Sequence, residues 1–274
     1  HSIVGGRMVV IPRVHNDNIG ASASIWSSVS EMRHWVQMQL NNGALDGKEV
    51  IPLEVIARTR EPQTILGAYP HRFNKRNFML YGLGWFLEDY ESRLIVSHTG
   101  GVDGFVSAVT LVPEKDLGIV ILTNTDQNSF YSTLNREIVD AFLGLPYRDY
   151  DALGYAAYTR SFEKEKKEVA ALRDSVLLFK GSYDPAIPGR YHHEVYGWLD
   201  IAPSDERQLS ITFEHHPDLS CRLSPVSPLR FLAEYSSPTY GTRVFEFRSD
   251  EGKMNFELSV AEFLEYTTYR FFRE

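Results

Sequence analysis

The spacing of apolar residues predicts three helices in the first half of the chain. Residues 27–40 carry apolar side chains on one helical face, and Ser28 with Glu31 three positions later has the spacing of a capping box. A short helix is expected over residues 52–60, since proline fits the first helical turn. A third helix is expected over residues 130–143, which also place their apolar residues near one face.

Between the second and third helices the pattern changes to that of strands. Four segments rich in β-branched and aromatic residues are separated by turns that contain glycine or charged residues, and they are residues 81–90, 93–98, 105–112 and 117–124. The uninterrupted apolar run at 119–122 predicts a strand that is covered on both faces. We therefore expect an α+β fold, a three- or four-stranded antiparallel sheet with packed helices.

The second half of the chain has a different pattern. Residues 160–174 are dense in charge and predict an exposed helix, to which the spacing of Glu163 and Lys167 adds a little stability. Beyond them, short strands recur every 8–15 residues, as in a small sandwich or barrel. The predicted organisation is a first domain over 1–147, a linker with the charged helix over 148–178, and an all-β, barrel-like domain over 179–274.

Composition and charge remove several classes of function. The net charge of −8 over 274 residues, with no cluster of lysine and arginine, argues against a nucleic-acid partner. No apolar run approaches the roughly 18 residues needed to cross a bilayer. The single cysteine, Cys221, cannot form an internal disulfide, and no cofactor is expected. The first residues, HSIVGGRMVV, are neither a signal peptide nor a methionine start, so we expect a piece of a longer protein.

Residues 97–105, SHTGGVDGF, contain the strongest candidate for chemistry. We expect His98, Thr99, Gly100 and Gly101 to lie where a strand ends and enters a loop. Two adjacent glycines let a ligand approach the backbone, whose N–H groups can stabilise an oxyanion, and a histidine can move protons near neutral pH. The alternative is a glycine-rich hairpin with a surface histidine, and local sequence does not decide between them.

The stretch from Gly82 to Asp126 resembles the last sheet strands of the serine β-lactamase and penicillin-binding-protein superfamily, in its esterase-like and peptidase-like branch. There the usual Lys-Thr-Gly box is often His-Thr-Gly. The segment GASASIWSSVSEMRHWVQMQL is similar to the family segment with a Ser-Ser-x-x-Asp-Met helix, with Glu31 in place of the aspartate. The C-terminal domain resembles the small lipocalin-like β domain that follows the hydrolase in one subgroup. The resemblance implies a partial β-lactamase-like fold.

The resemblance also implies roles for individual residues. His98 would line the active site and polarise the substrate or the proton relay, and the N–H of Gly101 would complete the oxyanion hole. Residues that would bind substrate or shape the edge of the pocket are Thr99, Gly100, Asp103, Gly104 and Phe105. No metal is implied, and the partner would be a small-molecule or peptide substrate. The family suggests a periplasmic or secreted location.

The nucleophile that this family needs is missing from the sequence. Its serine is followed three residues later by a lysine, which helps remove the hydroxyl proton. Among the lysines only Lys164, after Ser161, has that spacing, and it lies in the charged helix after the box that should follow it. No Tyr-x-Asn precedes residue 81, and residues 16–18, Asn-Asp-Asn, only superficially resemble the Ser-Asp-Asn box. We therefore expect the C-terminal part of a larger hydrolase, inactive without its missing N-terminal half.

Two other interpretations stay open. The histidine doublets His192-His193 and His215-His216, with Asp218 nearby, could bind zinc. Adjacent residues of a strand face opposite ways, however, so each doublet can give only one ligand to any one side. Aromatic residues of the C-terminal domain could line a ligand cavity, but packing in the core is favoured for Tyr191, Tyr196, Trp198, Phe213, Phe231, Tyr235, Phe245 and Phe247. The alternative function is that of a non-catalytic, degenerate hydrolase fold or a ligand-binding β-domain protein.

Overall fold

The computed structural model describes residues 1–4, 7–11, 19–102, 104–126, 128–205, 207–260 and 267–274. The chain divides into two compact units. The first contains His1 and Val10–Tyr158, and the second contains Ser2–Val9 and Thr159–Glu274.

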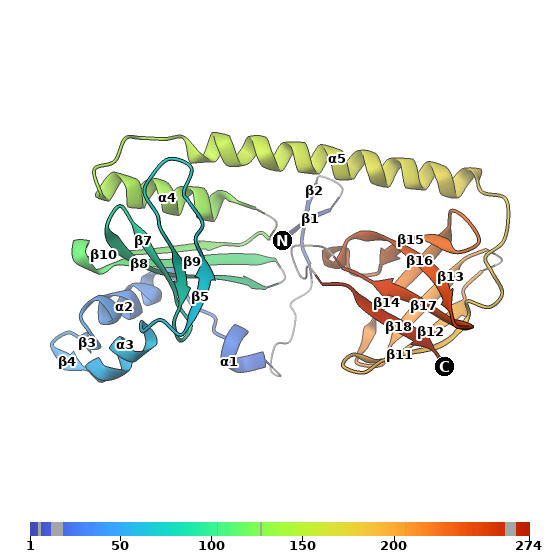
Figure 1. Cartoon of the computed structure of the whole chain (residues 1–274), viewed down its shortest axis with the longest axis horizontal. Coiled ribbons are helices and arrows are strands. Elements are labelled where there is room, and N and C mark those ends of the chain that lie inside the picture. Colours follow the sequence, from blue (N-terminus) through green and yellow to red (C-terminus); the bar gives the residue numbers. More distant parts are fainter. Residues whose placement is uncertain (5–6, 12–18, 103, 127, 206, 261–266) are drawn as a thin grey trace. The chain divides into compact units, whose positions relative to one another are not determined.

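The first unit is built on an antiparallel sheet of six strands, each next to its neighbour along the chain (Figure 1). In spatial order the strands are β10 (Leu117–Thr123), β9 (Phe105–Val112), β8 (Arg93–Val102), β7 (Phe86–Tyr90), β6 (Met79–Tyr81) and β5 (Thr64–Gly67). The predicted α+β class and the antiparallel meander are confirmed. The sheet is larger than expected because β5 and β6 extend it.

The prediction of a single strand over residues 81–90 is wrong. The segment is a hairpin, in which the backbone N–H of Gly82 donates to the carbonyl of Trp85 over 2.8 Å. Gly84 has φ of 82°, a conformation that glycine adopts without strain. The apolar residues between and after the two glycines give the turn the composition of a strand, which explains the error.

Among the described residues, four α-helices belong wholly to the first unit: α1 (Gly20–Ala23), α2 (Val29–Leu40), α3 (Leu53–Thr59) and α4 (Phe130–Phe142). A small hairpin of β3 (Ala44–Leu45) and β4 (Lys48–Glu49) follows α2. The three helices expected from the sequence are present. The capping box is also confirmed: Ser28 Oγ accepts from the N–H of Glu31, and the Glu31 carboxylate accepts from the N–H of Ser28.

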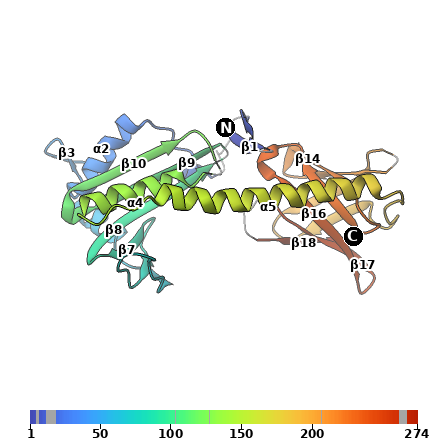
Figure 2. The same ribbon diagram turned by 90° about the horizontal axis from the view of Figure 1, so that it is seen from above.

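Helices α2 and α4 cover opposite faces of the sheet (Figures 1 and 2). Ile119 and Ile121 of β10 are buried in the cluster that includes Val139 of α4. Val120, between them, packs into the cluster that contains Val36 of α2. The continuous apolar run in β10 thus serves two apolar layers, as the sequence predicts.

The charged helix is longer than expected. Helix α5 extends over Tyr150–Leu178 and belongs to the first unit up to Tyr158 and to the second from Thr159. Its charged middle is exposed, and Lys164 forms an ion pair of 3.9 Å with Glu168 four residues later.

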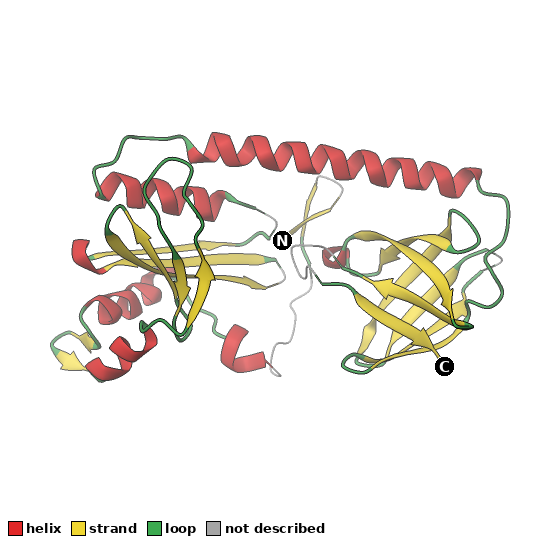
Figure 3. Ribbon diagram, in the orientation of Figure 1, coloured by secondary structure: helices red, strands yellow, loops and turns green. Residues whose placement is uncertain are grey.

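The second unit consists largely of strands (Figure 3). Eight antiparallel strands close into a barrel in chain order: β11 (Gly189–His193), β12 (Gly197–Pro203), β13 (Leu209–Phe213), β14 (His216–Pro225), β15 (Arg230–Tyr235), β16 (Thr242–Asp250), β17 (Lys253–Leu258) and β18 (Tyr269–Arg273). The hairpin of β1 (Ser2–Val4) and β2 (Arg7–Val9) also belongs to this unit. The predicted C-terminal barrel is confirmed.

The aromatic residues of the barrel mostly form its core. Those buried in one apolar cluster are Tyr191, Phe231, Tyr235, Phe245 and Phe247, and Phe213 packs against them. Tyr196 is 46% exposed, so its assignment to the core is wrong. It belongs to the turn between β11 and β12, where it contacts Tyr269. Trp198 is half-buried, with the guanidinium of Arg190 4.6 Å from its ring.

Two further observations concern the described residues. None of their helices combines the length and the apolar character needed to span a bilayer. Cys221 is a free, buried thiol whose pKa burial raises above its ordinary value.

Candidate active site

The His-Thr-Gly box lies inside a strand, which corrects the expectation that it enters a loop. Strand β8 continues to Val102 and pairs with β9 along its whole length, from Val96 opposite Leu111 to Val102 opposite Phe105. Gly104 lies in the short turn that precedes β9. Asp103 lies outside the described residues.

The box occupies the part of β8 that extends past β7, its neighbour on the side opposite β9. Strand β7 begins at Phe86, which pairs with Ser97, and the pairing with β8 runs from there to Tyr90. Residues 98–102 therefore have β9 as their strand partner on one side, while β7 does not reach them on the other. Backbone groups on that side are not used by the β7–β8 ladder, so they are candidates for binding a ligand.

The His98 ring is held by two aromatic residues from the neighbouring strands. The Tyr81 hydroxyl lies 3.1 Å from His98 Nε2. The Phe86 ring stacks on the imidazole, with centroids 5.4 Å apart and planes at 29°. These two contacts fix the position of the ring, and because His98 is only half-buried, the ring stays partly accessible to solvent.

The remaining residues of the box are accessible. Thr99, Gly100 and Gly101 are all exposed. A Cβ atom on Gly100 would meet Ser107 Oγ of β9 at 2.7 Å, so a larger residue here would require the Ser107 side chain to move. Phe105 is 38% exposed, and its ring meets Trp26 edge-on at 5.3 Å.

The turn after the box is fastened by a buried carboxylate. Gly104 has φ of 82° and is buried, and its N–H donates to Asp126 Oδ2 over 3.1 Å. Asp126 is fully buried, and its N–H donates in turn to the carbonyl of His1. A Cβ atom on Gly104 would lie 2.9 Å from the His1 nitrogen, which explains the glycine.

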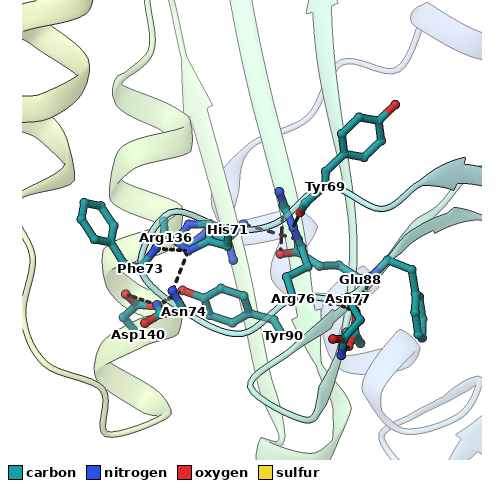
Figure 4. A network of polar contacts seen from close by, with 12 residues as sticks. Tyr69, His71, Phe73, Asn74, Arg76, Asn77, Glu88, Tyr90, Arg136 and Asp140 are labelled. Carbon is teal, nitrogen blue, oxygen red and sulfur yellow. Dashed lines mark hydrogen bonds and ion pairs between the residues drawn. The ribbon is translucent and has the colours of Figure 1, made fainter.

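A polar network supports β7 at the end remote from the box (Figure 4). Glu88 is buried between two guanidinium groups, with Arg76 at 3.3 Å and Arg136 at 3.4 Å. The Arg136 guanidinium also lies 4.4 Å from the centroid of the Tyr90 ring. Burial lowers the pKa of Arg136, but the charge and hydrogen bond of Glu88, together with Tyr90 and Asp140, outweigh that effect, so the pKa is raised.

The second half of the network is centred on Asp140 of α4 (Figure 4). This buried carboxylate accepts hydrogen bonds from the Tyr90 hydroxyl at 2.6 Å and the Tyr150 hydroxyl at 2.7 Å. Asn74 donates to it at 3.3 Å. Burial, followed by donation to Asp140, raises the pKa of both tyrosines. The network thus joins the segment between β5 and β6 to β7, α4 and the start of α5.

Sequence reasoning missed several of these residues. Tyr81, Phe86 and Asp126 were not among the candidates, and neither was Trp26. Tyr81 directly precedes the stretch that carries the family resemblance, and Phe86 lies within it. Their contact with His98 depends on a strand register that the missed turn at 82–85 conceals.

The other sequence candidates do not gather around His98. Ser161 and Lys164 are exposed on α5, and residues 16–18 lie outside the described residues. In the first histidine doublet, His193 Nδ1 accepts from the N–H groups of Val195 and Tyr196. Within the described ranges, no three His, Cys, Asp or Glu side chains are placed to hold a metal ion.

A cavity of about 660 Å³ lies between α2 and β10 and does not include His98 in its lining. Apolar side chains such as Val36, Leu40 and Val120 line it together with Arg33 and Asp116. Strand β10 is the last strand of the sheet on this side. The cavity therefore lies at the β10 edge of the sheet and is separate from the box.

Comparison with known families identifies the fold. Residues 3–142, about half of the chain, match the family model described as Beta-lactamase. The chain therefore belongs to the beta-lactamase family.

Individual relatives are more distant. The chain is 28% identical over 167 residues to "Unguisins hydrolase ungD'" of Aspergillus campestris, covering 56% of this chain and 30% of the relative. It is 27% identical over 122 residues to "Protein flp" of Staphylococcus aureus, covering 43% and 22% respectively. It spans about a third of the length of its fungal relatives. A penicillin-binding protein homologue from Pyrococcus abyssi aligns with a TM-score of 0.36 at 14% identity, over 90% of this chain and 47% of that one.

Proposed function

We propose that this chain is the box-bearing part of a β-lactamase-related serine hydrolase that transfers the acyl group of an ester, amide or β-lactam. The observation that carries the proposal is the half-buried His98 ring. It is held on the stretch of β8 that pairs with β9 but extends past β7. Membership of the beta-lactamase family and the hydrolase named among the relatives support it.

In the proposed reaction, His98 polarises the substrate or passes protons at the reacting centre. The N–H of Gly101 holds the oxyanion, a contribution of about 10²–10³ in rate for one donor. Thr99 and Gly100 line the same strand edge, and Phe105 borders it with an apolar ring. A small-molecule or peptide substrate fits this arrangement, since an extended strand can bind alongside a free strand edge.

The serine and lysine would come from polypeptide outside these 274 residues. Two features support such a partner segment. Strand β10 has β9 as its strand partner in the described part of the chain, which leaves its other edge available for pairing. The cavity between α2 and β10 exposes apolar side chains beside that edge. Alone, the chain should be inactive.

The test begins with the coding sequence upstream of His1, which should encode Ser-x-x-Lys followed by Tyr-x-Asn. The longer protein and the 274-residue chain are then treated with a fluorescent penicillin and a fluorophosphonate. We expect one of these probes to label the longer protein and neither to label the chain alone.

A pair of histidine variants of the longer protein tests the site itself. His98→Ala should slow labelling by about 10²–10⁴, the usual range for loss of a group that moves protons. His34→Ala changes an exposed histidine on α2 and should leave labelling unchanged. Labelling of the 274-residue chain, absence of the upstream serine and lysine, or full labelling of His98→Ala would each overturn the proposal.

A further inference from the structure

Three adjacent strands bring Tyr81, Phe86 and His98 together. Tyr81 of β6 pairs with Phe86 of β7, and Phe86 pairs with Ser97, the residue before His98. The Tyr81 and Phe86 rings meet edge-on with centroids 4.9 Å apart. Both side chains are half-buried, so the contacts with His98 are partly shielded from water.

The hydrogen bond between Tyr81 and His98 determines which imidazole nitrogen is free. A neutral imidazole has one N–H donor and one acceptor nitrogen, and the partner of one nitrogen decides the state of the other. A phenol can donate or accept, but the imidazole nitrogen is much the stronger base of the two. The stronger pairing over the observed 3.1 Å is therefore donation from the Tyr81 hydroxyl to Nε2.

We propose that Tyr81 is a positioning residue for His98: its hydroxyl donates to Nε2 and holds the neutral imidazole in the tautomer with its proton on Nδ1. Phe86 assists by stacking on the ring, which restricts its rotation. The Nδ1–H group is then the one left for the acyl-transfer site. This last consequence rests on the proposed function, whereas the pairing itself does not.

Nuclear magnetic resonance of the 274-residue chain tests the pairing directly. The chain is labelled with ¹⁵N at its nine histidines, and the two ring nitrogens are observed at about pH 8.5, where an ordinary imidazole is neutral. His98→Gln identifies the signals of His98. We expect Nε2 to have the shift of an acceptor nitrogen and Nδ1 that of a protonated one.

Tyr81→Phe removes one oxygen and should move the tautomer ratio of His98 toward Nε2–H by about twofold to tenfold, the ratio that one hydrogen bond is worth. Tyr69→Phe is the matched control, because its exposed hydroxyl donates to the Leu66 carbonyl instead. Phe86→Leu keeps the hydrogen bond and should keep the tautomer. Unchanged signals of the other histidines show that each variant is folded.

Two results would overturn the inference: an Nε2–H tautomer in the unmodified chain, or a ratio that Tyr81→Phe leaves unchanged. In the longer protein, Tyr81→Phe should lower kcat by about tenfold with a smaller change in KM. The two proposals can fail separately. A shifted tautomer without probe labelling supports the pairing and overturns only the hydrolase, whereas labelling with an unshifted tautomer does the reverse.

Discussion

In the barrel each strand from β11 to β18 pairs with two neighbours, whereas the sheet of the first unit ends at β10 and β5. The same unit also leaves residues 98–102 beyond the end of β7. Closure of a barrel removes strand edges and so removes places where another chain can pair. The six-stranded sheet therefore has free strand edges that the barrel lacks, and it is this sheet that carries the box.

The interiors of the two units also differ, in how many polar groups they bury. The barrel is filled by apolar side chains, many of them aromatic. The first unit has apolar layers on both faces of its sheet, but it also buries Glu88 and Asp140 in a network of charged and polar groups. Apolar packing tolerates change according to volume, whereas a polar network depends on every partner being present.

The largest effect is expected from the barrel core. Phe256 is 1% exposed and contacts the rings of Phe245, Phe247 and Phe271. Phe256→Ala should lower the free energy of unfolding of the barrel by about 3–5 kcal/mol, through lost burial and the cavity left behind. Hydrogen exchange followed residue by residue should show the loss in β11–β18 and little change in β5–β10. An equal loss in both units would show that they unfold together.

Removal of the central carboxylate should be the next largest effect. Asp140→Ala leaves the buried hydroxyls of Tyr90 and Tyr150 without their acceptor, which should cost the first unit about 2–3 kcal/mol. Chemical unfolding monitored by hydrogen exchange in α4 measures it. Asp151→Ala, a change to an exposed carboxylate at the start of α5, is the control and should cost less than about 0.5 kcal/mol. Equal costs for the two variants would contradict a structural role for the network.

A smaller, local effect is expected at the turn after the box. Asp126→Ala removes the acceptor of the Gly104 N–H and should lower stability by about 1–3 kcal/mol. Asp126→Asn keeps an oxygen for that bond and should cost less, since Oδ1 of this residue has no hydrogen-bond partner among the described residues. Exchange of the Gly104 amide should speed up in the alanine variant. If asparagine and alanine have the same effect, the hydrogen bond does not hold the turn.

Elements that depend on local sequence features are predicted correctly, whereas a turn inside an apolar stretch is missed. The helix over 29–40 depends on local features, a capping box and one apolar face, and the barrel strands depend on local alternation and turns. Both are predicted from the sequence. The hairpin at 82–85 is missed because Gly84 adopts positive φ within an apolar stretch, which composition does not reveal.

The site is predicted less completely than the fold. His98 is found through its resemblance to a family box. The adjacent glycines suggest a loop, although both lie in β8 and pair with Ser107 and Val106 of β9. Tyr81 is separated from His98 by 17 positions, and their contact depends on the register of two strand pairs. Pairings of this kind depend on the whole sheet and not on local sequence.

The smallest expected effect is a dependence of stability on pH, which His71 gives to the first unit. Burial, followed by the charges of Arg136 and Arg76, lowers the pKa of His71. His71 Nδ1 accepts the N–H groups of Phe73 and Asn74, and it can do so only while it is unprotonated. Because the folded pKa lies below the unfolded value of about 6.5, the stabilisation is complete above that pH. It is lost as the pH falls from there through the folded pKa.

The free energy of unfolding of the first unit should therefore decrease as the pH falls below about 6.5, before ordinary carboxylates begin to protonate. His71→Asn places an acceptor oxygen near the position of Nδ1 without a titrating group, so its pH dependence should be weaker. His34→Ala, at an exposed position on α2, should keep the dependence of the unmodified chain. If His71→Asn and the unmodified chain lose stability in parallel, His71 is not the group that titrates, and the pH sensitivity of the network lies elsewhere.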